Sequence, residues 1–201
     1  GTIRFDGRDL AACTAEDYRR LRGGEMGIVF QHAGASLNPT RRIRTQFAEA
    51  MRSHGTCSDA EITERAAELL HRMGFTDADH ILDAYPFTLS GGMAQRAAIA
   101  LALALRPRLL LADEPTSALD AALQRQMLQI LRTLRDEDGT ALLLVTHNIG
   151  VLRHIADRAA VIKDGRIIEQ GAAAELLIHP QCTDTQNLRS SNPRIGDPSP
   201  S

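Results

Sequence analysis

Apolar residues recur at helical spacing through much of the first half of this 201-residue chain. Between residues 43 and 85 they stand three or four positions apart, which indicates amphipathic helices. The clearest of these helices begins with Ser58-x-x-Glu61, the pattern of a capping box. Its apolar stripe consists of Ile62, Ala66, Leu69, Leu70 and Met73. The spacing therefore predicts a group of helices in this region.

Short, continuously apolar runs predict buried strands on both sides of these helices. They cover Met26–Phe30, Arg108–Asp113 and Ala141–Thr146. A nearly all-apolar helix is expected over Met93–Leu105, and an amphipathic helix over residues 123–134. Alternation of helices with apolar strands is typical of βαβ units around a parallel sheet. The sequence thus predicts an α/β fold with a mostly parallel sheet.

The two ends of the chain carry weaker signals. Thr2–Phe5 alternates like a strand, and Asp6-Gly7 follows it as a turn. Lys163-Asp164-Gly165 predicts a hairpin turn, and Ala172–Ile178 a last short helix. Residues 183–201 are polar and become rich in Pro and Ser, so we expect them to form a disordered tail.

Composition narrows the classes of function. A net charge of −2 leaves no broad basic surface, so we expect no nucleic-acid partner. The three cysteines are odd in number and far apart, which favours a reducing compartment over a disulfide framework. No apolar run approaches the roughly 20 residues of a membrane-spanning helix. The chain starts with Gly rather than Met, so we expect that upstream sequence is missing.

Polar side chains follow two of the predicted strands. Asp113 and Glu114 end one apolar run, and His147 ends another. In open α/β sheets the ligand lies beyond the carboxyl ends of the strands, so we expect these residues to face one site. Each has a plainer explanation when taken alone. Asp-Glu-Pro can simply end a strand and start a turn, and a single histidine is more often structural.

A Gly-rich motif, Ser90-Gly91-Gly92, precedes the predicted apolar helix. The exposed N–H groups and the dipole of a helix N-terminus favour an anion there. Glycines also let a phosphate come close to the backbone. An ordinary helix start with a serine cap is the alternative for so short a motif.

The order of these elements carries more information than any one of them. Leu89-Ser90-Gly91-Gly92-Met93 comes first, then the strand ending in Asp113-Glu114, then Ser117-Ala118-Leu119-Asp120, then His147. This order and spacing resemble the ATP-binding cassette (ABC) ATPases, as signature motif, Walker B, D-loop and H-loop. Gln31, at the end of an apolar strand, matches the Q-loop. The resemblance covers roughly residues 1–180.

The resemblance implies a role for each of these residues. Glu114 is the catalytic glutamate, which orients and deprotonates the attacking water. Asp113 lies in the Mg²⁺ shell, and Gln31 senses Mg²⁺ and water. His147 contacts the γ-phosphate of ATP.

Two further motifs act between subunits in the family. Ser90, Gly91 and Gly92 close on the γ-phosphate of ATP held by a second ABC ATPase subunit, so this motif works in trans. Asp120, in the D-loop, lies at the interface of that dimer, which is either a homodimer or a heterodimer.

Three details narrow the resemblance towards the oligopeptide, dipeptide and nickel importers. Tyr85-Pro86 precedes the signature, Met93 stands where most ABC proteins have Gln, and Gln31 leads to Ser36-Leu37-Asn38-Pro39. The resemblance implies a peripheral ATPase subunit at the cytoplasmic face of the membrane, with transmembrane permease subunits as partners. A periplasmic or extracellular solute-binding protein is an indirect partner. An ABC-like subunit of the phosphonate carbon–phosphorus lyase complex, whose Tyr-Pro and Ser-Gly-Gly-Met context is similar, is the alternative. A soluble ABC protein without a transporter is a more distant one.

The family's fold is a P-loop NTPase core with an inserted α-helical subdomain. We expect a partial ABC domain at residues 1–182, with the helical subdomain at about 41–106. A Walker A loop needs G-x-x-x-x-G-K-[ST], but the only lysine is Lys163. We therefore expect the first strands and the P-loop to be missing, and this chain alone not to be a competent ATPase. Either the sequence is a fragment of a complete ATPase, which we favour, or the gene is truncated and encodes a non-catalytic ABC partner.

Overall fold

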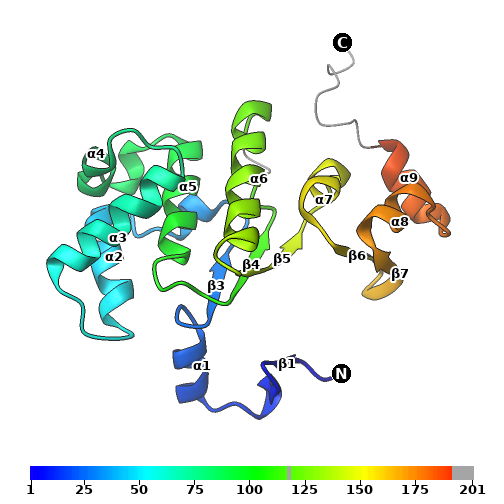
Figure 1. The fold of residues 1–201 in the computed structure, drawn as a ribbon, viewed down its shortest axis with the longest axis horizontal. Coiled ribbons are helices and arrows are strands. Elements are labelled where there is room, and N and C mark those ends of the chain that lie inside the picture. Colours follow the sequence, from blue (N-terminus) through cyan, green and yellow to red (C-terminus); the bar gives the residue numbers. More distant parts are fainter. Residues whose placement is uncertain (117–118, 192–201) are drawn as a thin grey trace. The chain divides into compact units, whose positions relative to one another are not determined.

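The computed structural model describes residues 1–116 and 119–191, and their contacts divide the chain into two compact units (Figure 1). The first unit comprises residues 1–118 and 135–144, and the second comprises residues 119–134 and 145–201. The expected partial ABC domain at residues 1–182 stays a prediction. Whether residues 41–106 form a separate subdomain stays a prediction, because their contacts belong to the first unit.

The first unit begins with a small antiparallel hairpin of β1 (Arg4–Phe5) and β2 (Arg8–Asp9). Its turn residues Asp6 and Gly7 have φ angles of 49° and 77°, and a two-residue hairpin turn of this kind requires positive φ at both positions. The predicted turn is therefore confirmed. Two short helices follow, η1 (Leu10–Ala12) and α1 (Ala15–Leu21).

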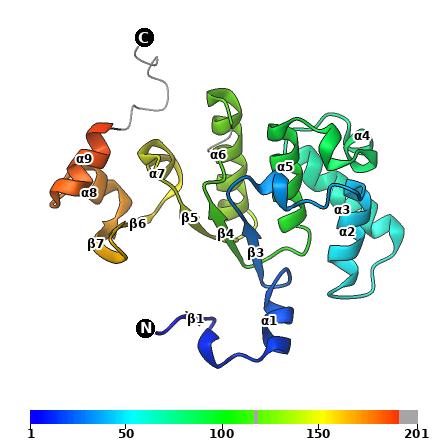
Figure 2. The same cartoon turned by 180° about the vertical axis from the view of Figure 1, so that it is seen from behind.

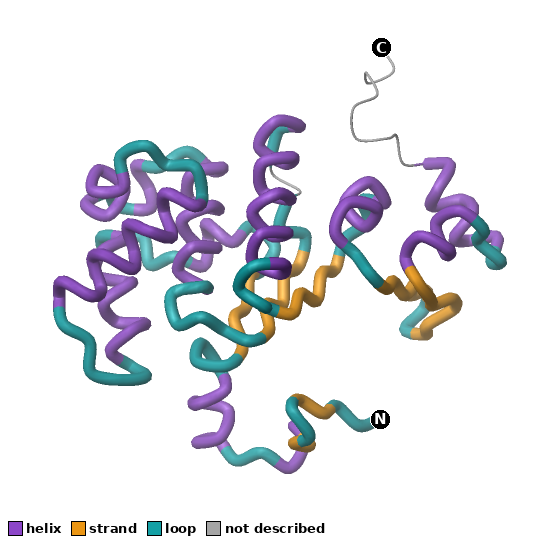
Figure 3. Tube along the Cα trace, in the orientation of Figure 1, coloured by secondary structure: helices purple, strands orange, loops and turns teal. Residues whose placement is uncertain are grey.

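Four α-helices form one group, which Figure 3 shows as clustered helical segments. They are α2 (Ile43–Arg52), α3 (Asp59–Arg72), α4 (Ala78–Asp83) and α5 (Gly91–Ala102). Two short 3₁₀ helices accompany them, η2 (Ala33–Ser36) and η3 (Pro86–Thr88). The predicted capping box of α3 is confirmed, since Ser58 and Glu61 exchange both bonds. The largest buried side chains of the group are Ile43, Phe47, Leu69, Leu70, Met73, Leu82 and Ile99.

Three strands form a sheet in the order β3 (Met26–Val29), β4 (Leu109–Asp113) and β5 (Ala141–Val145). Strand β3 runs parallel to β4, with Val29 opposite Ala112. The prediction of a fully buried strand at Ala141–Thr146 is wrong, because Leu143 is 57% exposed. Strand β5 lies at the edge of this sheet, and only alternate side chains along it are partly covered.

Helix α5 lies beside β3 and runs antiparallel to it (Figure 2). A Cβ added to Gly27, within β3, would lie 2.8 Å from the carbonyl oxygen of Ala102 at the end of α5. A Cβ added to Gly34, beyond the end of β3, would lie 2.8 Å from the Cβ of Ala94 in the first turns of α5. The N-terminus of α5 therefore lies towards the carboxyl ends of β3 and β4.

The second unit contains helices α6 (Ala121–Asp136, which ends in the first unit), α7 (Ile149–Ile155), α8 (Ala173–Ile178) and α9 (Thr183–Ser191). It also contains an antiparallel hairpin of β6 (Arg158–Lys163) and β7 (Arg166–Ala172). The predicted hairpin turn is confirmed, with φ angles of 49° at Asp164 and 73° at Gly165. Ile149, Leu176 and Leu177 form a small core, against which Leu152, Ala159 and Val161 pack.

The expected disordered tail is wrong for residues 183–191, which form α9. The helix is held by specific contacts rather than by an apolar stripe. The Nζ of Lys163 lies 2.7 Å from the carboxylate of Asp184, and Thr185 is only 2% exposed. Residues 192–201, the rest of that prediction, lie outside the described residues.

Candidate functional site

The parallel register brings two of the predicted polar segments to one edge of the sheet. Because Val29 is opposite Ala112, the residues that follow each of them leave the sheet at the same edge. Paired strands are about 4.8 Å apart. Gln31 and Asp113 are exposed there, and Glu114 is half-buried. The structure thus places Gln31, Asp113 and Glu114 at one edge of the sheet, and their action in a single site stays a prediction.

The backbone at Glu114 is unusual. Its φ angle is 49°, in the left-handed region that side-chain-bearing residues rarely adopt. Pro115 follows it, and a residue before proline has a further restricted backbone. Such a conformation persists only where the surrounding structure holds it. The direction in which Glu114 leaves β4 is therefore fixed by its surroundings.

Ser90 is the N-cap of α5. Its hydroxyl oxygen accepts a hydrogen bond from the N–H of Met93, at 3.3 Å. The simpler explanation of Ser90, a helix cap, is thus realised. The hydroxyl proton is not used in this bond, so Ser90 can still donate to a second group.

The glycines after Ser90 leave the helix terminus accessible. No atom lies within 4 Å of a Cβ added to Gly91. The first N–H groups of a helix have no acceptor within it and lie at the positive end of its dipole. Ser90, Gly91 and Gly92 therefore form a helix terminus that is suited to binding an anion.

The other two predicted residues belong to the second unit. The side chain of Asp120 accepts hydrogen bonds from the N–H groups of Ala122 and Leu123, both at 2.9 Å, and so caps α6. His147 is exposed and precedes Asn148, the N-cap of α7. The arrangement that joins Asp120 and His147 to Asp113 stays a prediction. Ser117 and Ala118 of the predicted D-loop lie outside the described residues.

The donors at the sheet edge suit a hard cation that is shared with a phosphate. Among the described residues, no group of three or more His, Cys, Asp or Glu side chains converges as a metal site. Asp113 and Gln31 contribute one carboxylate and one amide. Mg²⁺ prefers oxygen ligands and is commonly held by one or two protein groups together with water and substrate phosphates. The donor set therefore fits Mg²⁺ bound with a nucleotide.

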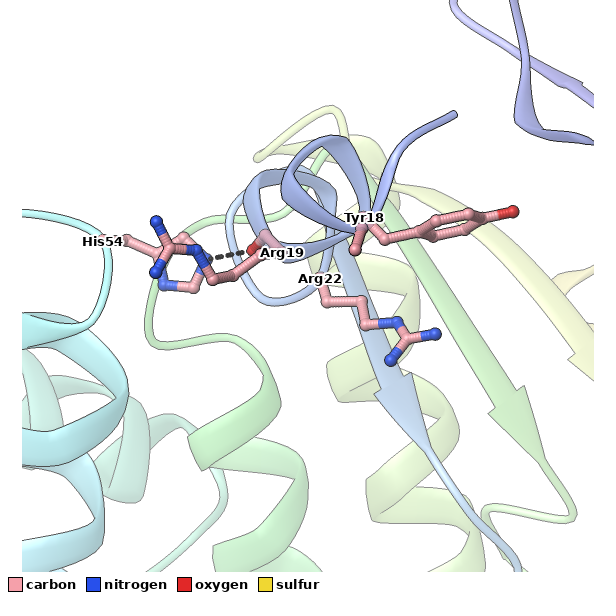
Figure 4. A pocket seen from close by; sticks show the side chains of 5 residues that line it. Tyr18, Arg19, Arg22 and His54 are labelled. Carbon is pink, nitrogen blue, oxygen red and sulfur yellow. Dashed lines mark hydrogen bonds between the residues drawn. The ribbon is translucent and has the colours of Figure 1, made fainter. Parts of the chain in front are cut away.

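A surface pocket elsewhere in the first unit contains none of the predicted site residues (Figure 4). Its walls come from α1 and from the segment after α2. His54 Nε2 lies 3.2 Å from the carbonyl oxygen of Arg19, and the guanidinium of Arg22 lies 5.4 Å from the centre of the Tyr18 ring. Arg19 is paired with Glu16. These contacts explain the pocket as the joint between α1 and the helical group.

Comparison with known proteins identifies the family. Residues 1–117 match the sequence model of the ABC transporter family. The chain belongs to the ABC transporter family. The predicted family and the predicted ABC-type α/β fold are confirmed.

Two similar ABC proteins are named for peptide transport. A peptide import ATP-binding protein of Brucella melitensis is 47% identical over 94% of this chain. The oligopeptide transport ATP-binding protein AppD of Bacillus subtilis is 40% identical over 97% of it. The chain spans 56% of the first protein and 60% of the second. The predicted resemblance to the peptide importers of the ABC family is thus confirmed.

Solved ABC structures share the fold of this cassette. A dimeric ATP-binding cassette bound to ADP and inorganic phosphate, described as a post-hydrolysis state, has a TM-score of 0.76 and 31% identity. The match covers 84% of this chain and 72% of that one. No helix among the described residues of this ABC chain has both the length and the apolar character needed to cross a bilayer.

One residue at the candidate site was not predicted from the sequence. Gln95, in α5, is 2% exposed, and its side-chain amide donates to the carbonyl oxygen of Pro115, next to Glu114. The available signal was a polar residue within a nearly all-apolar helix. That signal alone does not show which carbonyl group the amide would reach.

Proposed function

We propose that this chain is the ATP-hydrolysing part of an ABC importer for peptides. The observation that carries the proposal is the parallel pairing of β3 with β4, which brings Gln31 to the sheet edge where Asp113 and Glu114 follow. The names of the Brucella and Bacillus relatives support peptides as the transported class. The chain spans little more than half of those proteins, so activity, substrate and partners are proposed together.

In this proposal the sheet edge carries the chemistry. Asp113 and Gln31 are the residues that would hold Mg²⁺. Bound Mg²⁺ neutralises charge on the phosphates of ATP. Glu114 orients a water molecule and accepts its proton as the water attacks the γ-phosphate. His147 donates a hydrogen bond to the same phosphate.

The N-terminus of α5 serves the ATP of a second cassette. The hydroxyl of Ser90 and the N–H groups at Gly91 and Gly92 bind the γ-phosphate that the other subunit holds. The open space at Gly91 supports this role, because a phosphate needs close access to the backbone. Asp120 lies at the interface between the two cassettes, and its bonds to Ala122 and Leu123 fix the first turn of α6 there.

The importer needs partners that this chain does not replace. Transmembrane permease subunits form the path through the membrane, and a solute-binding protein delivers the peptide to them. The ATPase acts at the cytoplasmic face of the membrane. The choice of peptide belongs to the permease and the binding protein.

Peptide uptake tests the proposal. The gene is inactivated in its native host and restored as wild type, as Asp113→Ala, or as Asp79→Ala, a control at an exposed residue of α4. We expect uptake of labelled di- to pentapeptides to fall on inactivation, to return with the wild type and the control, and to stay low with Asp113→Ala. Unchanged uptake of all these peptides on inactivation would reject the proposal. Loss of growth on phosphonates in their place would support the carbon–phosphorus lyase alternative.

A further inference from the structure

Gln95 is a buried polar side chain with only half of its amide in use. It lies in α5 and is 2% exposed. Its Nε2 donates to the carbonyl oxygen of Pro115, while its Oε1 has no hydrogen-bond partner among the described residues. An unpartnered buried oxygen costs stability. An apolar side chain of the same size would avoid that cost, so packing alone does not explain a glutamine here.

The bond to Pro115 acts on the segment that carries Glu114. Glu114 has a positive φ angle, and Pro115 and Thr116 after it are buried. Pro115 has no N–H, so its carbonyl oxygen is its only backbone hydrogen-bonding group. Gln95 takes that group. The bond therefore fixes the peptide between Pro115 and Thr116, one residue beyond Glu114.

The same part of α5 also contacts the segment after Gln31. A Cβ added to Gly34 would lie 2.8 Å from the Cβ of Ala94 and 3.3 Å from the backbone nitrogen of Gln95. The segment that follows Gln31 is therefore packed tightly against the helix. Helix α5 begins at Gly91, so its first turns link Ser90, the segment after Gln31 and the segment after Glu114.

We propose that Gln95 is a positioning residue that sets the orientation of Glu114 and makes it depend on the position of the signature helix α5. The inference rests on the proposed function, in which Glu114 activates water. When Ser90 and its neighbours close on the ATP of a second cassette, a shift of α5 is passed through Gln95 to Pro115 and Glu114. Closure of the dimer thereby controls the rate of ATP hydrolysis. The binding of ATP does not depend on Gln95.

The substitution Gln95→Met tests this role, because it keeps the length of the side chain and removes the donor. The protein is expressed from its complete reading frame with its partner subunits. We expect kcat for ATP hydrolysis to fall about 10- to 100-fold, the effect of displacing a catalytic group by about 1 Å. KM for ATP and the melting temperature should stay near the wild-type values. Gln95→Leu is the second variant, should Gln95→Met not fold.

Gln46 provides a matched control. It is also a buried glutamine, 8% exposed, and its amide bonds to the backbone of Asn38 and Arg41. Within the described part of the chain, its side-chain hydrogen bonds go to Asn38 and Arg41 and not to the segment after Glu114. Gln46→Met should lower the melting temperature and leave kcat within about twofold. An equal loss of kcat in both variants would mean that any buried glutamine has this effect, and would overturn the proposal.

A double-mutant cycle with Glu114→Gln shows whether Gln95 acts through Glu114. If it does, adding Gln95→Met to Glu114→Gln changes the residual hydrolysis rate little. Multiplication of the two single effects would overturn the positioning role. If the wild type hydrolyses no ATP, or Glu114→Gln has no effect, the proposed function itself fails. If Gln95→Met keeps the wild-type kcat while Glu114→Gln greatly lowers it, the positioning role of Gln95 is wrong and the proposed function stands.

Discussion

Arg96 lies over the ring of Phe75, with its guanidinium carbon 4.3 Å from the ring centre. The same side chain donates to the carbonyl oxygen of Met73, at 2.9 Å. Burial lowers the pKa of Arg96. The pair connects α5 to the segment after α3, so it fixes the signature helix within the helical group.

The first prediction concerns this pair. Arg96→Lys should lower the free energy of unfolding by about 1 kcal/mol, because an ammonium group cannot both stack flat on the ring and reach the carbonyl. Urea denaturation measures the loss. In a cycle with Phe75→Leu, the two substitutions should cost less together than the sum of the single effects. Full additivity would show that the ring and the guanidinium do not interact.

The second prediction concerns acid. The backbone N–H and the hydroxyl of Ser58 donate to Glu61 and lower the pKa of its carboxyl group. A carboxyl whose pKa is lower in the folded state stabilises the protein above the unfolded pKa, and this contribution is lost as the pH falls through the folded value. The melting temperature of Glu61→Gln should therefore lie below that of the wild type at pH 7, and the gap should narrow as the pH falls through the lowered pKa of Glu61.

Glu64→Gln, an exposed change of the same charge within α3, is the control for that experiment. At pH 7 the melting temperature of Glu64→Gln should lie closer to that of the wild type than the melting temperature of Glu61→Gln does. A gap for Glu61→Gln that stays constant from pH 7 to pH 3 would contradict the role given to the capping box.

The third prediction concerns the 201-residue chain by itself. It should bind ATP weakly and hydrolyse it negligibly, because its sequence contains no G-x-x-x-x-G-K-[ST] loop to hold the β- and γ-phosphates. Its only lysine, Lys163, is paired with Asp184 at 2.7 Å. Titration calorimetry should detect no micromolar binding. Such binding, or turnover near 1 s⁻¹, would show that other residues of the chain hold the phosphates.

The fourth prediction concerns the signature motif. In the protein expressed from its complete reading frame, Gly92→Asp puts a carboxylate beside the γ-phosphate of the second cassette, where like charges repel. Binding of ATP to a single cassette should survive, while dimerisation and hydrolysis fail. Gly55→Asp is the control, since a Cβ there meets no atom within 4 Å. If Gly92→Asp still dimerised normally with ATP, the signature motif would not act on the ATP that the second cassette holds.

The sequence predicts those parts of the fold whose signal is local. The capping box at Ser58 and the hairpin turns at Gly7 and Gly165 depend on a few adjacent residues, and they are found as predicted. Helix α9 was missed because it has no apolar stripe, and its buried Thr185 and the Lys163–Asp184 pair are tertiary contacts. The exposure of Leu143 was missed because an apolar run does not say whether its strand lies at the edge of a sheet.

The candidate site shows the same limit. The order of the motifs was sufficient to place Gln31, Asp113 and Glu114 at one edge of the sheet, since parallel strands have their carboxyl ends together. The roles of these residues stay predictions. The sequence did not predict the positive φ angle of Glu114 or the bond from Gln95 to Pro115. The bond depends on how α5 packs against a segment 20 positions further along the chain, which no local pattern encodes.

The most direct test of the account is ATP hydrolysis by Glu114→Gln. Expressed from its complete reading frame, this variant should still bind Mg-ATP, and it should accumulate as an ATP-bound dimer. Its hydrolysis rate should fall by about 10²–10⁴-fold, the usual contribution of a general base. Single-turnover kinetics on the isolated dimer measures this rate. Hydrolysis at the wild-type rate would contradict the account and would make His147 the next candidate for the base.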